Sequence, residues 1–234
     1  MKSFGLAQLR QLARDNKGFL FVVFGMIFMR SALADWYVVP SSSMYPHLLE
    51  GDRVISNRVA YDIRIPFTDI ILKKVGNPQR GDIVTFFSPE DGTRLVKRVI
   101  GLPGDTIEMR DRRLIINGEE ANYQEVPDVP REYLTPRYEM SQRVFTETLG
   151  DLHHNIIVMP DVYQSIQSFA PVQIPEGQYV MLGDNRDNSR DSRYFHFVKR
   201  ELITGRVSRL MFSLDYENHY MPRFDRFGAK VAQQ

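Results

Sequence analysis

The sequence predicts a mainly β protein that follows one apolar N-terminal helix. Residues 18–29 (GFLFVVFGMIFM) carry no charge, and after Pro40 the chain consists of short runs rich in valine, isoleucine and phenylalanine, separated by glycine and proline turns. Beyond the apolar segment, no helical period of useful length is present. At 234 residues and 43% hydrophobic composition, the chain can bury a core as one large domain or as one domain with an insertion.

The apolar segment predicts a retained transmembrane anchor over residues 18–35. A bilayer core asks for about 20 apolar residues, so Arg30 must lie near one end of the helix, where its side chain reaches the interface. Trp36 and Tyr37 suit an interfacial position. The positive-inside rule places residues 1–17 in the cytoplasm and the remainder on the outer, periplasmic or extracytoplasmic face of the cell (inner) membrane. The charges that decide this are Lys2, Arg10, Arg14 and Lys17 against Asp15.

Two alternatives to the anchor are open. A cleaved secretory signal has similar basic and apolar regions, and residues 31–34 (SALA) are small enough to suit cleavage. A buried core helix is the other alternative. The anchor and the cleaved signal both place the rest of the chain outside the cytoplasm, whereas the core helix carries no such implication.

The runs after Pro40 predict β-strands, because β-branched and aromatic residues favour pleated surfaces. These strands cover residues 53–56, 82–87, 94–100, 106–109, 113–116, 179–182 and 205–212. Turn signals occupy residues 103–105, 117–118, 175–177 and 183–185. The segment from about residue 119 to 170 is polar and weakly patterned, and we interpret it as an insertion in the β core.

Composition excludes several classes of function. Lysine and arginine total 30 against 29 acidic residues, so no field of one sign exists to recruit nucleic acid. The absence of cysteine excludes disulfides, a cysteine nucleophile and thiolate metal sites. Residues 183–193 are rich in carboxylates, but Arg186 and Arg190 interrupt them, and no glycine or terminal glutamate falls where an EF-hand needs one. The sequence therefore predicts neither a metal nor a cofactor.

Two segments carry groups suited to nucleophilic chemistry. Residues 40–46 (PSSSMYP) form a serine cluster that prolines stiffen at both ends. On the predicted strand 94–100, alternation puts Leu95 and Val99 on the same face as Lys97. A lysine that acts as a base near neutral pH needs its pKa lowered by about 3 units from about 10.4, which desolvation can do. From these residues alone, a solvated loop serine and a solvated strand lysine are the favoured interpretation.

Four segments, in this order behind the apolar helix, resemble the signature boxes of bacterial type I signal peptidases, also called leader peptidases: PSSSMYP, GDRVISNRVAY, RGDIVTFFSPEDGTRLVKRVIGLPGD and GDNRDNSRDSR. The resemblance covers essentially the whole chain. It implies an antiparallel β-sheet catalytic core in two parts, 36–106 and 177–234, with a second β subdomain inserted at 107–176. It also implies a membrane-bound serine endopeptidase that removes signal peptides from exported preproteins after small-x-small sites of the Ala-x-Ala kind. Its partners would be preproteins and membrane lipid, close to the translocon.

The resemblance also implies roles for individual residues. Ser43 matches the nucleophile that forms an acyl-enzyme, and Lys97 matches the general base. Ser41 matches the side chain that completes an oxyanion hole with the Ser43 N–H. Ser189 matches a hydroxyl that orients the lysine. The residues matching supports of that loop are Asp184, Arg186, Asp191 and Arg193. The implied walls of the substrate pocket are Tyr37, Val39, Met44, Leu48 and Val96. Leu95 departs from the family pattern, in which tyrosine or phenylalanine is common.

Other functions compete with this interpretation. A conjugative-transfer peptidase or a self-cleaving repressor would use the same residue pair, although the repressor would need a DNA-binding domain and would leave the apolar helix unexplained. A Ser-His-Asp hydrolase is disfavoured because the sequence has no Gly-x-Ser-x-Gly elbow. An inactive membrane protein that binds signal peptides without cutting them would not need every matched catalytic residue.

Overall fold

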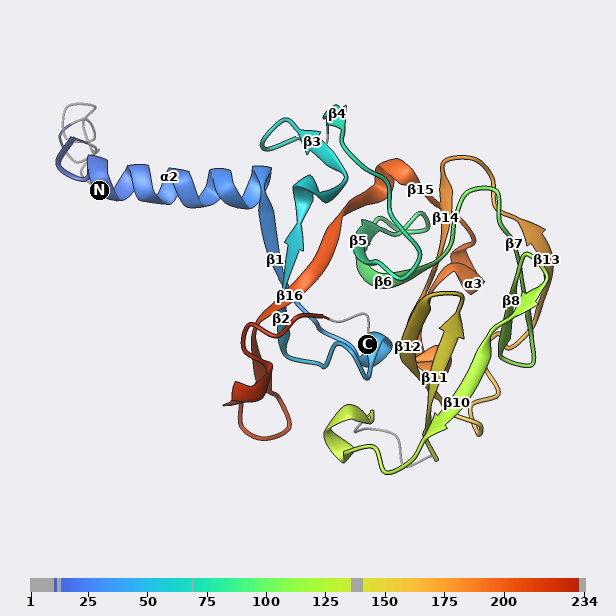
Figure 1. The fold of residues 1–234 in the computed structure, drawn as a ribbon. Coiled ribbons are helices and arrows are strands. Elements are labelled where there is room, and N and C mark those ends of the chain that lie inside the picture. Colours follow the sequence, from blue (N-terminus) through green and yellow to red (C-terminus); the bar gives the residue numbers. More distant parts are fainter. Residues whose placement is uncertain (1–10, 12–13, 69, 136–140, 232–234) are drawn as a thin grey trace.

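The N-terminal helix projects from a β-rich body in the computed structural model, which describes residues 11, 14–68, 70–135 and 141–231 (Figure 1). Helix α2 (Lys17–Ala32) has 16 residues, none of them buried, so the buried-core-helix alternative is wrong. It rises about 24 Å at about 1.5 Å per residue. Within the described ranges, no helix combines the length and the apolar character needed to cross a bilayer. The transmembrane anchor stays a prediction, and most of the predicted cytoplasmic segment, residues 1–10 and 12–13, lies outside the described residues.

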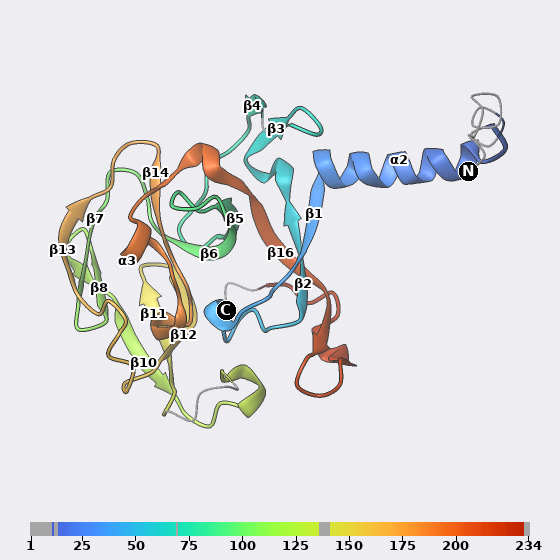
Figure 2. The ribbon, with the colours of Figure 1, turned by 180° about the vertical axis from the view of Figure 1, so that it is seen from behind.

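The main sheet is antiparallel and curls on itself (Figures 1 and 2), which confirms the predicted mainly β architecture. Its edge strand β1 follows α2 directly. Strand β16 is irregular and pairs with β2 along one part and with β5 along another. In order across the sheet, the strands are β1 (Ala34–Val38), β2 (Asp52–Asn57), β16 (Ile203–Asp215), β5 (Ile83–Phe87), β6 (Arg94–Gly101), β14 (Gln178–Leu182) and β15 (Val198–Lys199), with β17 (Met221–Pro222) against β16.

Three smaller sheets complete the fold. One is the hairpin of β3 (Asp62–Arg64) and β4 (Ile71–Lys74). The second, in the order β13, β7, β8, β9, comprises Phe169–Gln173, Thr106–Arg110, Arg113–Ile116 and Glu119–Glu120. The third comprises β10 (Asn122–Val126), β11 (Arg143–Leu149) and β12 (Leu152–Val158). Short helices lie between strands: η1 (Ser42–Met44), η2 (Arg58–Ala60), η3 (Arg131–Tyr133), η4 (Arg186–Asn188), α3 (Ser192–Phe195), η5 (Arg200–Leu202) and η6 (Phe224–Arg226).

Every run predicted as a strand overlaps a strand of the structure, but the polar segment 119–170 contains strands that the sequence did not single out. In β10 and β13 most residues are exposed, so neither strand has a face of apolar residues from which it could be predicted. The division into a two-part core and an inserted subdomain stays a prediction.

Strand β6 runs between two hydrophobic clusters, and this placement buries its centre. Leu95 and Val99 pack in a cluster with Val84, which stands opposite Lys97 on β5. Val96, on the other face, packs against a second cluster that contains Met44. Apolar side chains therefore cover both faces of the strand that carries Lys97.

Candidate active site

The serine segment lies where the chain leaves β1 and before it returns as β2. Ser42 is buried and Ser43 half-buried in the single turn of η1. The loop after β14 holds this turn in place, because Asn185 N donates a hydrogen bond of 3.1 Å to the Ser43 carbonyl. Asn188 Nδ2 donates one of 2.8 Å to Ser42 Oγ. The sequence did not single out either asparagine for this role, although both lie in the dense polar run 183–193.

Lys97 reaches Ser43 from β6. Its Nζ lies 2.7 Å from Ser43 Oγ and 3.1 Å from the Val96 carbonyl, and the residue is only 3% exposed. Burial lowers the pKa of Lys97 from 10.5 to about 8, although the more distant carboxylates of Asp191 and Asp184 oppose this shift. A hydroxyl and an amine at hydrogen-bond distance, with the amine able to lose its proton near neutral pH, have the geometry for general-base activation of a nucleophile.

Gly183 explains how the loop comes so close to the serine. A Cβ at this position would lie 2.2 Å from Ser189 Oγ and 2.6 Å from the Ser43 carbonyl oxygen, so only glycine fits. Ser189 is buried, and although its Oγ forms no hydrogen bond of standard geometry with the described residues, it lies close enough to Asp191 to help lower the pKa of that carboxyl. The hydrogen bond to Lys97 that the resemblance implies is therefore not made in this structure, in which Nζ is directed to Ser43 and Val96. Ser41 is exposed at the start of η1, and its side chain does not cap that turn.

Buried ion pairs fix the loop around these groups. Asp184 receives two hydrogen bonds of 2.8 Å from Arg98, the residue after Lys97 on β6. The structure contains the Asp191–Arg193 pair, with 2.8 Å between Oδ2 and Nη2. Burial alone would raise the pKa of Asp191, but the charge and hydrogen bond of Arg193, together with the Gly183 N–H and the Ser189 hydroxyl, lower it.

Arg186 is held by a partner from a distant strand. Its guanidinium donates hydrogen bonds of 2.7 and 2.5 Å to Glu147 of β11. Sequence reasoning missed both Arg98 and Glu147. The sequence does contain a signal for Arg98. It follows Lys97 directly on a predicted strand, so its side chain must lie on the opposite face of that strand. Glu147 offers no such signal, since it lies in the weakly patterned segment.

A half-buried histidine, His47, and a buried one, His154, adjoin the same pairs. His47 Nδ1 lies 2.9 Å from Asp184 Oδ2, and His154 Nε2 lies 3.4 Å from Glu147 Oε1. Burial lowers the pKa of His47, against the opposing effect of Asp184. Burial also lowers the pKa of His154 to about 3. Within the described residues, no group of three or more His, Asp or Glu side chains could hold a metal ion.

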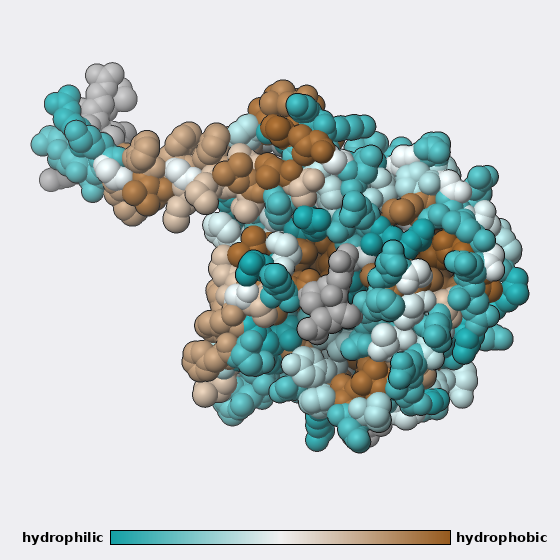
Figure 3. Space-filling model, in the orientation of Figure 1, coloured by the Kyte–Doolittle hydropathy of each residue, from teal (hydrophilic) through white to brown (hydrophobic). Residues whose placement is uncertain are grey.

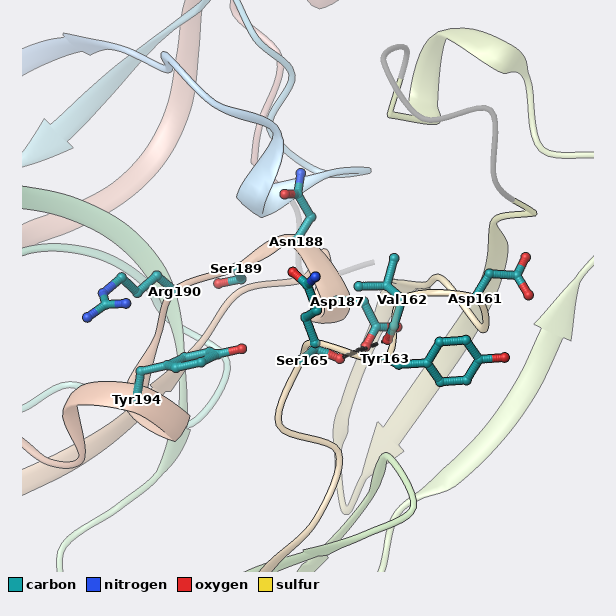
Figure 4. Close-up of a pocket in the computed structure, with 10 residues that line it drawn as sticks. Asp161, Val162, Tyr163, Ser165, Asp187, Asn188, Ser189, Arg190 and Tyr194 are labelled. Atoms are coloured by element: carbon teal, nitrogen blue, oxygen red, sulfur yellow. Dashed lines mark hydrogen bonds between the residues drawn. The ribbon is translucent and has the colours of Figure 1, made fainter.

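The residues predicted to line a substrate pocket share one hydrophobic cluster beside η1. Its members include Val39, Met44 and Leu48, with Tyr37 and Val96 packed against them. On the other side of the loop lies a cavity of about 640 Å³ that Asn188 and Ser189 border. Figure 4 shows Tyr163 and Tyr194 on opposite sides of this cavity, with Ser165 hydrogen-bonded to Asp187 between them.

Comparison with known proteins gives consistent matches. The profile of the family described as signal peptidase, peptidase S26, matches residues 13–212. A signal peptidase I of Pseudomonas fluorescens is 34% identical over 93% of this chain and 78% of that protein. One of Pseudomonas aeruginosa is 38% identical over 80% of this chain and 64% of that protein. A crystal structure of a signal peptidase I from Enterococcus faecalis is 36% identical and covers 57% of this chain and 98% of that one, with a TM-score of 0.34.

Proposed function

Because the chain belongs to the signal peptidase family, peptidase S26, and is thus a serine peptidase, we propose that it removes signal peptides from exported preproteins with Ser43 as nucleophile and Lys97 as general base. The observation that carries the proposal is the 2.7 Å contact between Lys97 Nζ and Ser43 Oγ. Surroundings that lower the lysine pKa to about 8 support it.

The reaction proceeds through an acyl-enzyme. Neutral Lys97 accepts the Ser43 proton as Oγ attacks the scissile carbonyl carbon. The Ser43 N–H and the Ser41 hydroxyl donate hydrogen bonds to the oxyanion of the tetrahedral intermediate. Lys97 then gives its proton to the leaving amine, and the C–N bond breaks. A water molecule that Lys97 deprotonates hydrolyses the ester and returns the hydroxyl to Ser43.

The substrate binds as an extended peptide with small residues at the first and third positions before the scissile bond. Strand β1 pairs with β2 alone among the described strands, so its other edge can accept a peptide by strand addition. The cluster of Val39, Met44 and Leu48 is already buried, at 4%, 1% and 0% exposure. We expect these apolar walls to accept alanine-sized side chains and to exclude larger ones.

The protein acts at the membrane, held by residues 18–35 with its N-terminus in the cytoplasm and its catalytic part on the outer face, near the translocon. Exposed phenylalanines along α2, such as Phe19, Phe21 and Phe24, support this placement. Apolar side chains also gather over the adjacent β3–β4 hairpin (Figure 3). Recovery of the protein in the alkaline-soluble fraction of lysed cells, instead of the membrane pellet, would contradict it.

The cleavage test uses the full chain purified in detergent and a preprotein with an Ala-x-Ala site. We expect a single cut after the second alanine, identified by mass spectrometry of the mature product. Ser43→Ala should abolish it, whereas Ser208→Ala, at an exposed serine of β16, should not. If the wild-type protein leaves the preprotein intact, or if Ser43→Ala cuts it at the wild-type rate, the proposed function is wrong.

A further inference from the structure

Arg94, at the start of β6, is held between two aromatic rings. The carbon of its guanidinium lies 4.6 Å from the ring centroid of Tyr37 and 5.0 Å from that of Phe87. Tyr37 belongs to β1 and Phe87 to β5, so the side chain spans from β6 to the edge strand of the curled sheet. A planar guanidinium stacks well on such faces, and this holds it in a fixed orientation while its side chain stays 36% exposed.

The nearby carboxylate, that of Asp35, forms no hydrogen bond with Arg94. Asp35 accepts hydrogen bonds from Arg30 Nε at 2.7 Å and from the Tyr37 hydroxyl at 2.5 Å. Arg58 and Arg94 lie farther from it, at 3.9 and 3.7 Å. Three guanidinium groups thus surround one carboxylate, which leaves the cluster with an excess of positive charge. Among the described residues, none accepts a hydrogen bond from the Arg94 guanidinium, whose donors remain available to a ligand.

The same end of β6 leads to the reacting atoms. The segment from Asp35 to Ser43 lies beside the segment from Arg94 to Lys97. Asp35 is close to Arg94 at one end, and Ser43 contacts Lys97 at the other. Strand β14 pairs with β6 only from Arg98 onward, so within the described residues the earlier part of that edge is unpaired. At about 3.3 Å per residue, Arg94 lies about 10 Å along the strand from Lys97. A peptide extended along these edges would pass Arg94 about three residues or more from its scissile bond.

The direction of the substrate follows from α2, and this step rests on the proposed function. Helix α2 joins β1 just before Asp35, so the Arg94 end of the path is the end nearest to the membrane. A signal peptide has its apolar part on the N-terminal side of the cleavage site. That side therefore lies toward Arg94, and the mature chain leaves beyond Ser43.

We propose that Arg94 is a specificity residue that senses charge in the signal peptide about three to five residues before the scissile bond. It favours acidic or neutral polar side chains there and rejects lysine and arginine, because a cation would meet a guanidinium cluster already in excess of its carboxylate. The substrate class is thus narrower than small-x-small sites in general: preproteins whose polar segment before the cleavage site lacks basic residues.

The test compares peptides that differ only at the fourth residue before the scissile bond, which is glutamine, glutamate or lysine. We expect the wild-type protein to cleave the glutamate peptide with a kcat/KM about fivefold or more above that of the lysine peptide, as about 1 kcal/mol of ion pairing gives. Arg94→Gln should reduce this ratio toward one, and Arg94→Glu should bring it closest to one, because two guanidinium groups and two carboxylates then remain in the cluster. Addition of salt should reduce the wild-type ratio.

Arg113→Gln is the matched control, because Arg113 is also an exposed arginine over a tyrosine ring, 5.3 Å from the centroid of Tyr123. It should keep the wild-type ratio. Equal cleavage of all three peptides by the wild-type protein would overturn the role of Arg94 while leaving the peptidase activity established. Failure to cleave even the glutamine peptide would instead refute the proposed function, so the two failures are distinguishable.

Discussion

Strand β6 carries two buried basic residues next to each other, Lys97 and Arg98, and their side chains have different kinds of partner. Arg98 is 1% exposed and forms two hydrogen bonds of 2.8 Å to the carboxylate of Asp184. Lys97 is 3% exposed and contacts a hydroxyl and a carbonyl, Ser43 Oγ and Val96 O. One cation is paired with a full opposite charge, and its neighbour is not.

The difference separates a structural role from a chemical one. A buried charge is unfavourable unless an opposite charge compensates for it. An arginine stays charged, because it does not lose its proton in proteins. A lysine can, and burial without a contacting carboxylate favours its neutral form. Arg98 therefore ties the loop of Asp184 to β6, while Lys97, one residue earlier, is left able to accept a proton.

The largest expected effect comes from making the two positions alike. Lys97→Arg keeps a cation at the site but removes the ability to be neutral, so we expect kcat/KM to fall by more than about 10⁴-fold. Steady-state cleavage of the Ala-x-Ala preprotein measures this, with circular dichroism to verify that the variant is folded. A folded variant that retains a tenth of the wild-type activity would mean that Lys97 is not the base.

The second effect is on stability. Arg98→Ala leaves the buried carboxylate of Asp184 without its bidentate partner, which we expect to lower the free energy of unfolding by about 3–5 kcal/mol. Chemical denaturation followed by tryptophan fluorescence measures it. The control is Arg190→Gln, which removes an exposed pair with Glu90 and should leave the denaturation midpoint close to the wild-type value. Equal midpoints for both variants would show that the Arg98–Asp184 pair does not hold the loop.

Sequence reasoning reached part of this arrangement. The alternation of Leu95, Lys97 and Val99 was enough to predict an apolar setting for the lysine, because strand periodicity is a local property. The contact with Ser43 joins residues 54 positions apart and came from family resemblance, since no local pattern specifies it. Ion-pair partners from distant strands, such as Glu147 for Arg186, depend on how the sheets pack. No local sequence pattern predicts them.

The matched loop residues show the same limit in another way. Resemblance placed Ser189 on the lysine, whereas the structure directs Lys97 Nζ to Ser43 and leaves the Ser189 hydroxyl without a hydrogen bond of standard geometry. A motif does not specify which of the neighbouring oxygen atoms the lysine contacts. The placement of the Arg94 guanidinium could not be predicted from the sequence either, because it depends on three strands that meet only in the folded sheet.

The smallest effect, and the most direct probe of the contrast between Lys97 and Arg98, is pH dependence. With a pKa of about 8, Lys97 is increasingly protonated below that pH and cannot accept the Ser43 proton. We therefore expect kcat/KM to fall about tenfold for each pH unit below about 8 and to level off above it. Asp191 is one of the carboxylates that raise the lysine pKa, so Asp191→Asn should move the falling limb to lower pH if the variant stays folded. A peptide without ionisable side chains keeps substrate titration out of the profile. Activity that stays constant from pH 8 to pH 5 would show that the base is not a lysine titrating in this range, and Lys97 would then be a buried cation of the same kind as Arg98.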